Sequence, residues 1–200
     1  GGLNGIFIVF DGKAILGTRA RKIRSKSFAA FDSIGYPIAA FIDDNQIIKY
    51  LEAPVVQGEV RFAPSISDSV FLLKLIPGIR PEILAYLGEH YDIIVIESYG
   101  VGGIPFYDKR NFMNELRTLT EKGKIIVIAT QVMLEGSDAE KYEVGALALD
   151  RYNVLQSFDM TVESAVTKLM WLCAEHSDYE EIRDGFYTCI NHDLLYEPKN

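Results

Sequence analysis

The 200-residue sequence has few of the features that define membrane, nucleic-acid-binding or disulfide-rich proteins. No apolar run approaches the roughly 18 residues that a membrane-spanning helix needs, so no membrane partner is expected. The formal net charge of −8 disfavours nucleic acid as a main partner. Only two cysteines occur, Cys173 and Cys189, without CxxC spacing. They indicate reduced thiols and a cytoplasmic protein, with a single disulfide as the alternative.

Metal-binding and hydrolase motifs are also scarce. The three histidines, His90, His176 and His192, form no HxxxH pattern and have no paired cysteines beside them. The sequence therefore predicts no metal site and no cofactor. It also lacks a G-x-S-x-G nucleophile elbow, so the residues alone provide no complete catalytic set.

Short strands are predicted in the first quarter of the chain. Two turn signals, at Asp11-Gly12 and at residues 43–45, separate pairs of apolar segments, at 6–10 with 14–17 and at 38–42 with 47–50. Residues 53–68 lose this periodicity and contain Pro54, Gly58 and Pro64, which indicates a linker.

The pattern after residue 69 predicts an α/β fold. Continuous apolar runs at 70–76, 92–97 and 124–130 suit strands that are covered on both faces, as in a parallel sheet. Helical patterns follow them, at 81–87 ending at Gly88, at 109–122, near 144–151, after a cap at Asp159, and at 179–187. This alternation predicts a small, doubly wound, Rossmann- or flavodoxin-like domain with three layers.

Ligands of such sheets gather at the carboxyl ends of the strands, where three loops are predicted, at 77–80, 98–105 and 130–138. The glycines of 98–105 lack the spacing of a dinucleotide fingerprint, and Pro105 and Phe106 delay any helix that could bind phosphate. A tight loop is therefore the preferred interpretation of that segment.

A basic segment interrupts this acidic chain, with Arg19, Arg21, Lys22, Arg24 and Lys26. For most of these side chains the expected role is a solvated charged face. A nucleic-acid arm would need interleaved aromatic residues, and none occurs between the first and last of these cations. The sharper interpretation is that one or two of them meet a small anionic substrate, where a lysine could exchange protons with a hydroxyl nucleophile.

Five blocks, at residues 10–22, 97–105, 129–131, 142–145 and 159–169, occur in order along the chain. Together they closely resemble the type I, cytoplasmic L-asparaginases. The resemblance implies that the substrate amide of L-asparagine acylates a threonine, and that water then releases aspartate and ammonia. The family lysine of a Thr-Lys-Asp triad aligns with Lys22, which is expected to relay a proton. Arg19, Arg21 and Arg24 are expected to be surface or structural neighbours.

The family's two threonine segments, Thr-Gly-Gly-Thr and Thr-Asp, do not occur among these residues. The chain is therefore expected to be the C-terminal part of such an enzyme, separated from an N-terminal segment and inactive alone. The resemblance implies that residues 1–52 end an N-terminal α/β domain with a β-hairpin. It places the linker at 53–68, a C-terminal α/β domain at 69–193 and a tail at 194–200.

Family active sites form between protomers of a homodimer or a dimer of dimers. Tyr142 aligns with a position that reaches the partner's pocket, and packing at the interface is its alternative role. Some bacterial members also bind an effector asparagine through Thr, Arg and Cys, positions aligned with Ala20, Glu97 and Val132. Because a carboxylate repels the carboxylate that the arginine would bind, effector control is expected to be lost.

Two other functions are considered. One is the related amidotransferase subunit that supplies ammonia for glutamyl-tRNA, which would be expected to carry an extra tRNA-associated domain. The other is a non-catalytic ligand-binding or dimerisation module.

Overall fold

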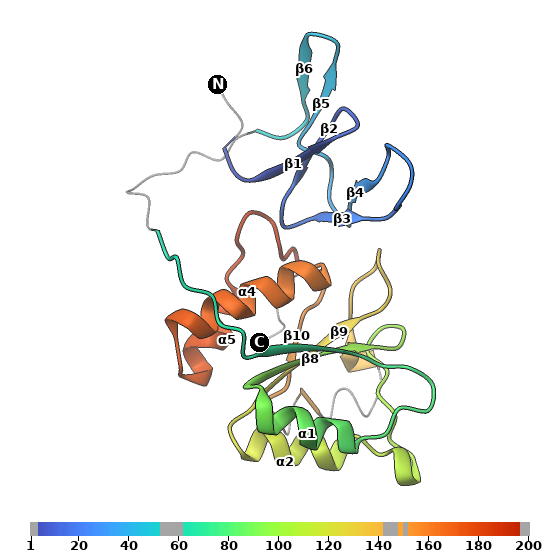
Figure 1. Ribbon diagram of the computed structural model, residues 1–200, viewed down its shortest axis with the longest axis vertical. Helices are drawn as coiled ribbons and strands as arrows, with labels where there is room; N and C mark the ends of the chain where they lie inside the picture. Colours follow the sequence, from blue (N-terminus) through green and yellow to red (C-terminus); the bar gives the residue numbers. More distant parts are fainter. Residues whose placement is uncertain (1–3, 53–61, 142–147, 150–151, 197–200) are drawn as a thin grey trace.

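The computed structural model describes residues 4–52, 62–141, 148–149 and 152–196. Within these ranges, no helix has the length and apolarity needed to cross a membrane. Strands gather in three sheets, and the helices accompany the parallel one (Figure 1).

Both predicted hairpins form in one antiparallel sheet of order β1-β2-β5-β6. Its strands are β1 (Phe7–Phe10), β2 (Lys13–Leu16), β5 (Ala40–Asp43) and β6 (Gln46–Lys49). The first turn has φ of 50° at Asp11 and 72° at Gly12, the pair of positive values that a two-residue hairpin of matching twist requires. A Cβ at Gly12 would lie 3.0 Å from the carbonyl oxygen of Ile42, so glycine also allows the close approach.

The basic segment forms a strand that its composition did not predict. β3 (Ala20–Lys22) pairs antiparallel with β4 (Phe31–Ser33), with Lys22 opposite Phe31. This two-stranded ribbon lies between the antiparallel sheet and the helical part of the molecule (Figure 1).

The parallel sheet confirms the α/β prediction. β7 (Val70–Lys74), β8 (Ile93–Ser98), β9 (Ile125–Thr130) and β10 (Leu155–Gln156) lie in the order β10-β9-β8-β7, all parallel. α1 (Glu82–His90) and α2 (Met113–Glu121) cover one face, and α4 (Val162–Glu175) and α5 (Tyr179–Tyr187) cover the other (Figure 1). The result is the predicted three-layer arrangement.

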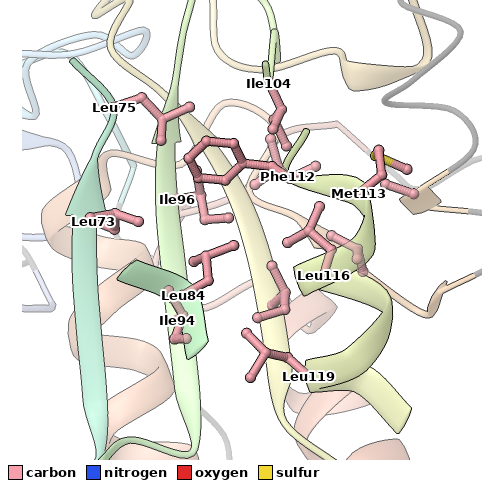
Figure 2. Packing of buried hydrophobic residues seen from close by; sticks show 14 of the residues in the cluster. Leu73, Leu75, Leu84, Ile94, Ile96, Ile104, Phe112, Met113, Leu116 and Leu119 are labelled. Carbon is pink, nitrogen blue, oxygen red and sulfur yellow. The ribbon is translucent and has the colours of Figure 1, made fainter. Parts of the chain in front are cut away.

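Alternation along the central strands divides the core into two clusters. Ile94 and Ile96 of β8 face α1 and α2, whereas Ile93 and Val95 face α4 and α5. In the first cluster the ring of Phe112 lies among aliphatic side chains from both the sheet and α2 (Figure 2). Burial of each such side chain contributes about 1.5–3 kcal/mol, which explains why β8 and β9 are apolar on both faces.

Three predicted helix boundaries are wrong. Helix α1 continues past Gly88 to His90. The glycine serves helix packing instead, since a Cβ there would lie 2.2 Å from Cδ2 of Leu119 in α2. Residues 108–110 form a separate 3₁₀ turn, so α2 begins only at Met113. The cap of α4 is Thr161, whose side chain accepts the Ser164 N–H, and Asp159 has other partners.

Candidate functional site

Lys22 lies at the end of β3, exposed to solvent. Its Nζ is 5.9 Å from the centroid of the Phe31 ring on the paired strand. Within the described ranges, its ammonium group makes no hydrogen bond or ion pair. The strand itself is fixed by its backbone pairing with β4, and beyond Lys22 the N–H of Ile23 donates to the carbonyl of Ala30 at 2.7 Å. An exposed amine on an anchored strand can exchange a proton with a group brought to it.

Arg19, three residues earlier, has the structural one of its two expected roles and does not lie on a solvated face. Its side chain is fully buried and pairs with Asp159, Nη2 to Oδ2 at 2.7 Å. Its Nη1 also donates to the Asp159 carbonyl at 2.8 Å, and its Nε donates to the carbonyl of His192 at 2.5 Å. No local pattern signals this role, because both partners are at least 140 residues away in the sequence.

The three aligned effector positions differ in their environments. Ala20 is buried on β3, and Glu97 is buried at the end of β8, where its Oε2 lies 3.2 Å from Lys74 Nζ of β7. Val132 follows β9 and is 39% exposed. Gln131, beside it, donates to the carbonyl of Glu97 at 3.0 Å, so Glu97 and Val132 share the carboxyl edge of the sheet. The structure gives Glu97 a cationic partner already within the chain.

Hydroxyl groups at this carboxyl edge are engaged in structural hydrogen bonds. Ser98 Oγ donates to the carbonyl of Ala129 at 2.5 Å, and Thr130 Oγ1 donates to the carbonyl of Gly100. Thr130 Oγ1 also accepts the N–H of Val132 at 2.9 Å. These contacts hold the loops after β8 and β9 and leave neither hydroxyl arranged beside a base.

The loop at 98–105 closes on itself, as the tight-loop interpretation predicts. Tyr99 N donates to Gly103 O at 3.0 Å, and Gly103 N donates back to Tyr99 O at 2.7 Å. A Cβ on Gly102 would lie 2.7 Å from the Ala139 Cα, so glycine lets this loop contact the next one. The amides of Tyr99, Gly102 and Gly103 are thus used within the loop rather than directed at a phosphate.

Next to these loops lies a cavity of about 450 Å³. Its lining comprises Val101, Glu135, Gly136, Ser137, Asp138, Glu140, Lys141, Phe158 and Tyr196. Tyr142, the predicted inter-protomer residue, lies outside the described residues. Among the described residues, no three His, Cys, Asp or Glu side chains lie together in a group that could hold a metal ion.

Two family matches cover most of the chain. Residues 69–186 match the Glutaminase/Asparaginase C-terminal domain, and residues 2–55 match Asparaginase, N-terminal. The chain therefore belongs to the asparaginase family.

Relatives that are similar to this chain over most of its length include L-asparaginases and a glutamyl-tRNA(Gln) amidotransferase subunit. An L-asparaginase of Thermococcus kodakarensis is 39% identical over 182 residues, which are 91% of this chain and 55% of the relative. L-asparaginase 1 of Escherichia coli is 28% identical over 96% of this chain and 56% of its own length. A glutamyl-tRNA(Gln) amidotransferase subunit of Methanosphaera stadtmanae is 30% identical over 89% of this chain and 41% of its own.

The solved structure of the thermostable L-asparaginase from Thermococcus kodakarensis superposes with a TM-score of 0.90 at 36% identity, covering 96% of this chain and 58% of that one. The chain spans about half the length of the asparaginases that it matches.

Proposed function

We propose that this chain is the C-terminal part of an L-asparaginase that hydrolyses L-asparagine to L-aspartate and ammonia. The observation that carries the proposal is the similarity to an L-asparaginase over 91% of the chain, a share that includes residues of both the antiparallel four-stranded sheet and the parallel sheet. The nucleophile would be a threonine, supplied by a segment outside these 200 residues.

Lys22 would serve the reaction by proton transfer. It would take up the proton of the threonine hydroxyl during attack on the amide carbon, and later return it. Its exposure supports this role, since the reacting groups can reach Nζ. The anchored strand supports it further, because proton transfer depends on a fixed donor–acceptor geometry.

The proposal also assigns the larger organisation of the protein. Residues 1–52 would complete an N-terminal domain, 53–68 would be the linker, and 69–193 would be the C-terminal domain followed by a tail. The active site would form in a homodimer or a dimer of dimers, with Tyr142 near the partner's pocket. The free thiols of Cys173 and Cys189 support a cytoplasmic location.

The test uses the full-length protein and ammonia release from L-asparagine. Lys22→Met should lower kcat by about two orders of magnitude or more, the usual scale for an acid–base group. Arg21→Met, a matched loss of charge on the same strand, should change kcat little because its ion pair with Glu163 is partly exposed. Equal losses in the two variants would mean that the basic segment acts as a general electrostatic patch.

The isolated 200-residue chain is expected to release no ammonia from asparagine, since it has no threonine in a Thr-Gly-Gly or Thr-Asp context. Ammonia release by this chain that a Lys22→Ala change abolishes would contradict the proposed origin of the nucleophile.

A second candidate is the ammonia-supplying subunit of a glutamyl-tRNA amidotransferase, favoured by the similarity to glutamyl-tRNA(Gln) amidotransferase subunits. Hydrolysis of glutamine that depends on a tRNA-charging partner, without activity on free asparagine, would favour this function instead. A protein inactive on both amides would favour a binding or dimerisation module.

A further inference from the structure

The buried guanidinium of Arg19 joins three segments that are far apart in the sequence. It directly precedes β3, the strand that carries Lys22. Its partner Asp159 precedes α4, and its Nε donates to the carbonyl of His192 near the C-terminal end. The ring of Tyr36 adds a further contact, since the Arg19 Cζ lies 5.7 Å from the centroid of that ring. The His192 ring stacks on the Tyr36 ring, with the two centroids 4.8 Å apart.

Asp159 extends the network on its other side. While its Oδ2 accepts from Arg19, its Oδ1 accepts the backbone N–H groups of Leu195 at 3.0 Å and Tyr196 at 3.3 Å. Thr18, the neighbour of Arg19, donates its hydroxyl to the carbonyl of Asn191 at 2.7 Å. Residues 191–196 are therefore hydrogen-bonded both to the two residues before β3 and to Asp159, which precedes α4.

The β3–β4 ribbon depends on such contacts for its orientation, because two strands are marginally stable by themselves. On one side, Phe10 of β1 packs against Phe31 of β4 with ring centroids 5.4 Å apart. On the other side, Arg19 makes a buried ion pair with the helical part, and Arg21 makes a partly exposed one with Glu163. A buried guanidinium with several charge-assisted hydrogen bonds fixes the orientation of the ribbon far more firmly than a partly exposed ion pair does.

We propose that Arg19, together with Asp159, is a positioning residue that sets the place of Lys22 Nζ relative to the reacting threonine. This inference rests on the proposed asparaginase function. Arg19 acts through the direction of β3 and touches neither substrate nor nucleophile. Arginine is required because its planar fork reaches the Asp159 carboxylate, the Asp159 carbonyl and the His192 carbonyl together, whereas a lysine offers one point of charge.

The experiment is a double-mutant cycle in the full-length protein, with kcat, KM and the pH profile of kcat for asparagine as readouts. Arg19→Met should lower kcat about tenfold or more, since a misplacement of 1 Å is enough for such a loss, and should leave KM within about threefold. The pH profile should shift, because proton transfer through Lys22 is what changes. In a Lys22→Met background the same change should cost nothing further.

Arg21→Met is the matched control, and Arg19→Lys should fall between Arg19→Met and the unmodified protein. If Arg19→Met does not fold, Asp159→Asn replaces it in the same cycle, because it keeps the side-chain size and removes the charge.

An equal loss of kcat in both backgrounds would show a general structural role and overturn the inference. An active wild-type protein whose kcat and pH profile Arg19→Met leaves unchanged would also overturn the inference while the proposed function stands. A wild-type protein without asparaginase activity would overturn the proposed function itself.

Discussion

The ion pair between Lys168 and Asp193 offers a quantitative test of what stabilises the helical part. Lys168 Nζ lies 2.8 Å from Asp193 Oδ2, with side-chain exposures of 4% and 2%. The same ammonium group donates to the carbonyl of Thr188 at 2.6 Å, and Asp193 Oδ1 accepts the N–H of Ile190 at 2.7 Å. The pair therefore fastens residues 188–193 to the buried side of α4.

Replacing Lys168 by Met keeps most of the side-chain volume but leaves the buried Asp193 carboxylate without its cation. Removing one partner of a buried pair costs about 3–5 kcal/mol. With a urea m value of about 2 kcal/mol/M, the unfolding midpoint should fall by about 1.5–2.5 M. The double change Lys168→Met with Asp193→Asn removes both charges and should recover at least about half of that loss.

The protein supplies its own control and probe. Lys124 and Asp92 also lie 2.8 Å apart, but their side chains are 22% and 69% exposed. Lys124→Met should therefore cost less than about 1 kcal/mol, a midpoint shift below about 0.5 M. Trp171, the single tryptophan of the chain, lies one turn from Lys168 on α4, so its fluorescence reports unfolding of this region. Equal midpoint shifts for Lys168→Met and Lys124→Met would refute the argument from burial.

Two further outcomes are expected. The full-length protein of the proposed function should show hyperbolic rates in asparagine and one bound ligand per protomer, because Glu97 presents a carboxylate, paired with Lys74, at the position that the family resemblance aligns with an arginine of the effector site. Reversing a charge at a desolvated contact costs several kcal/mol. Sigmoidal rates or a second asparagine beside Glu97 would contradict this expectation. Burial first, and then the negative charge of Asp92, raises the pKa of the Cys173 thiol from 9.0 to about 11. The folded state therefore favours the neutral thiol. The contribution of Cys173 to the free energy of unfolding is fully present below pH 9.0 and is lost as the pH rises through about 11. Iodoacetamide should therefore label the exposed Cys189 first near pH 8, and it should label Cys173 only as the pH approaches about 11. Equal labelling rates of the two cysteines at pH 8 would contradict the raised pKa of Cys173.

Sequence periodicity determined the elements whose stability depends on local patterns. Apolar runs at 92–97 and 124–130 favoured strands covered on both faces, and the structure has them as β8 and β9 in the middle of the sheet. The turn residues Asp11 and Gly12 likewise set the first hairpin, because their positive φ values are a local property of the chain.

Tertiary contacts decided what local patterns leave open. Gly88 looked like a helix end, yet it lies inside α1, where its missing side chain makes room for Leu119 of α2. The two-residue strand β10 carries too few residues for any periodicity and forms by pairing with β9.

The basic segment shows the same division at the candidate site. The sequence by itself placed Lys22 as the residue of interest, through its resemblance to a family motif. Nothing local distinguished Arg19 from the other cations nearby, since all of them are equally polar in sequence. Only the fold brings Asp159 and the His192 carbonyl to it from more than a hundred residues away. The free energy that keeps a guanidinium buried comes from these long-range partners, so the tertiary structure alone separates the buried cation from the exposed one.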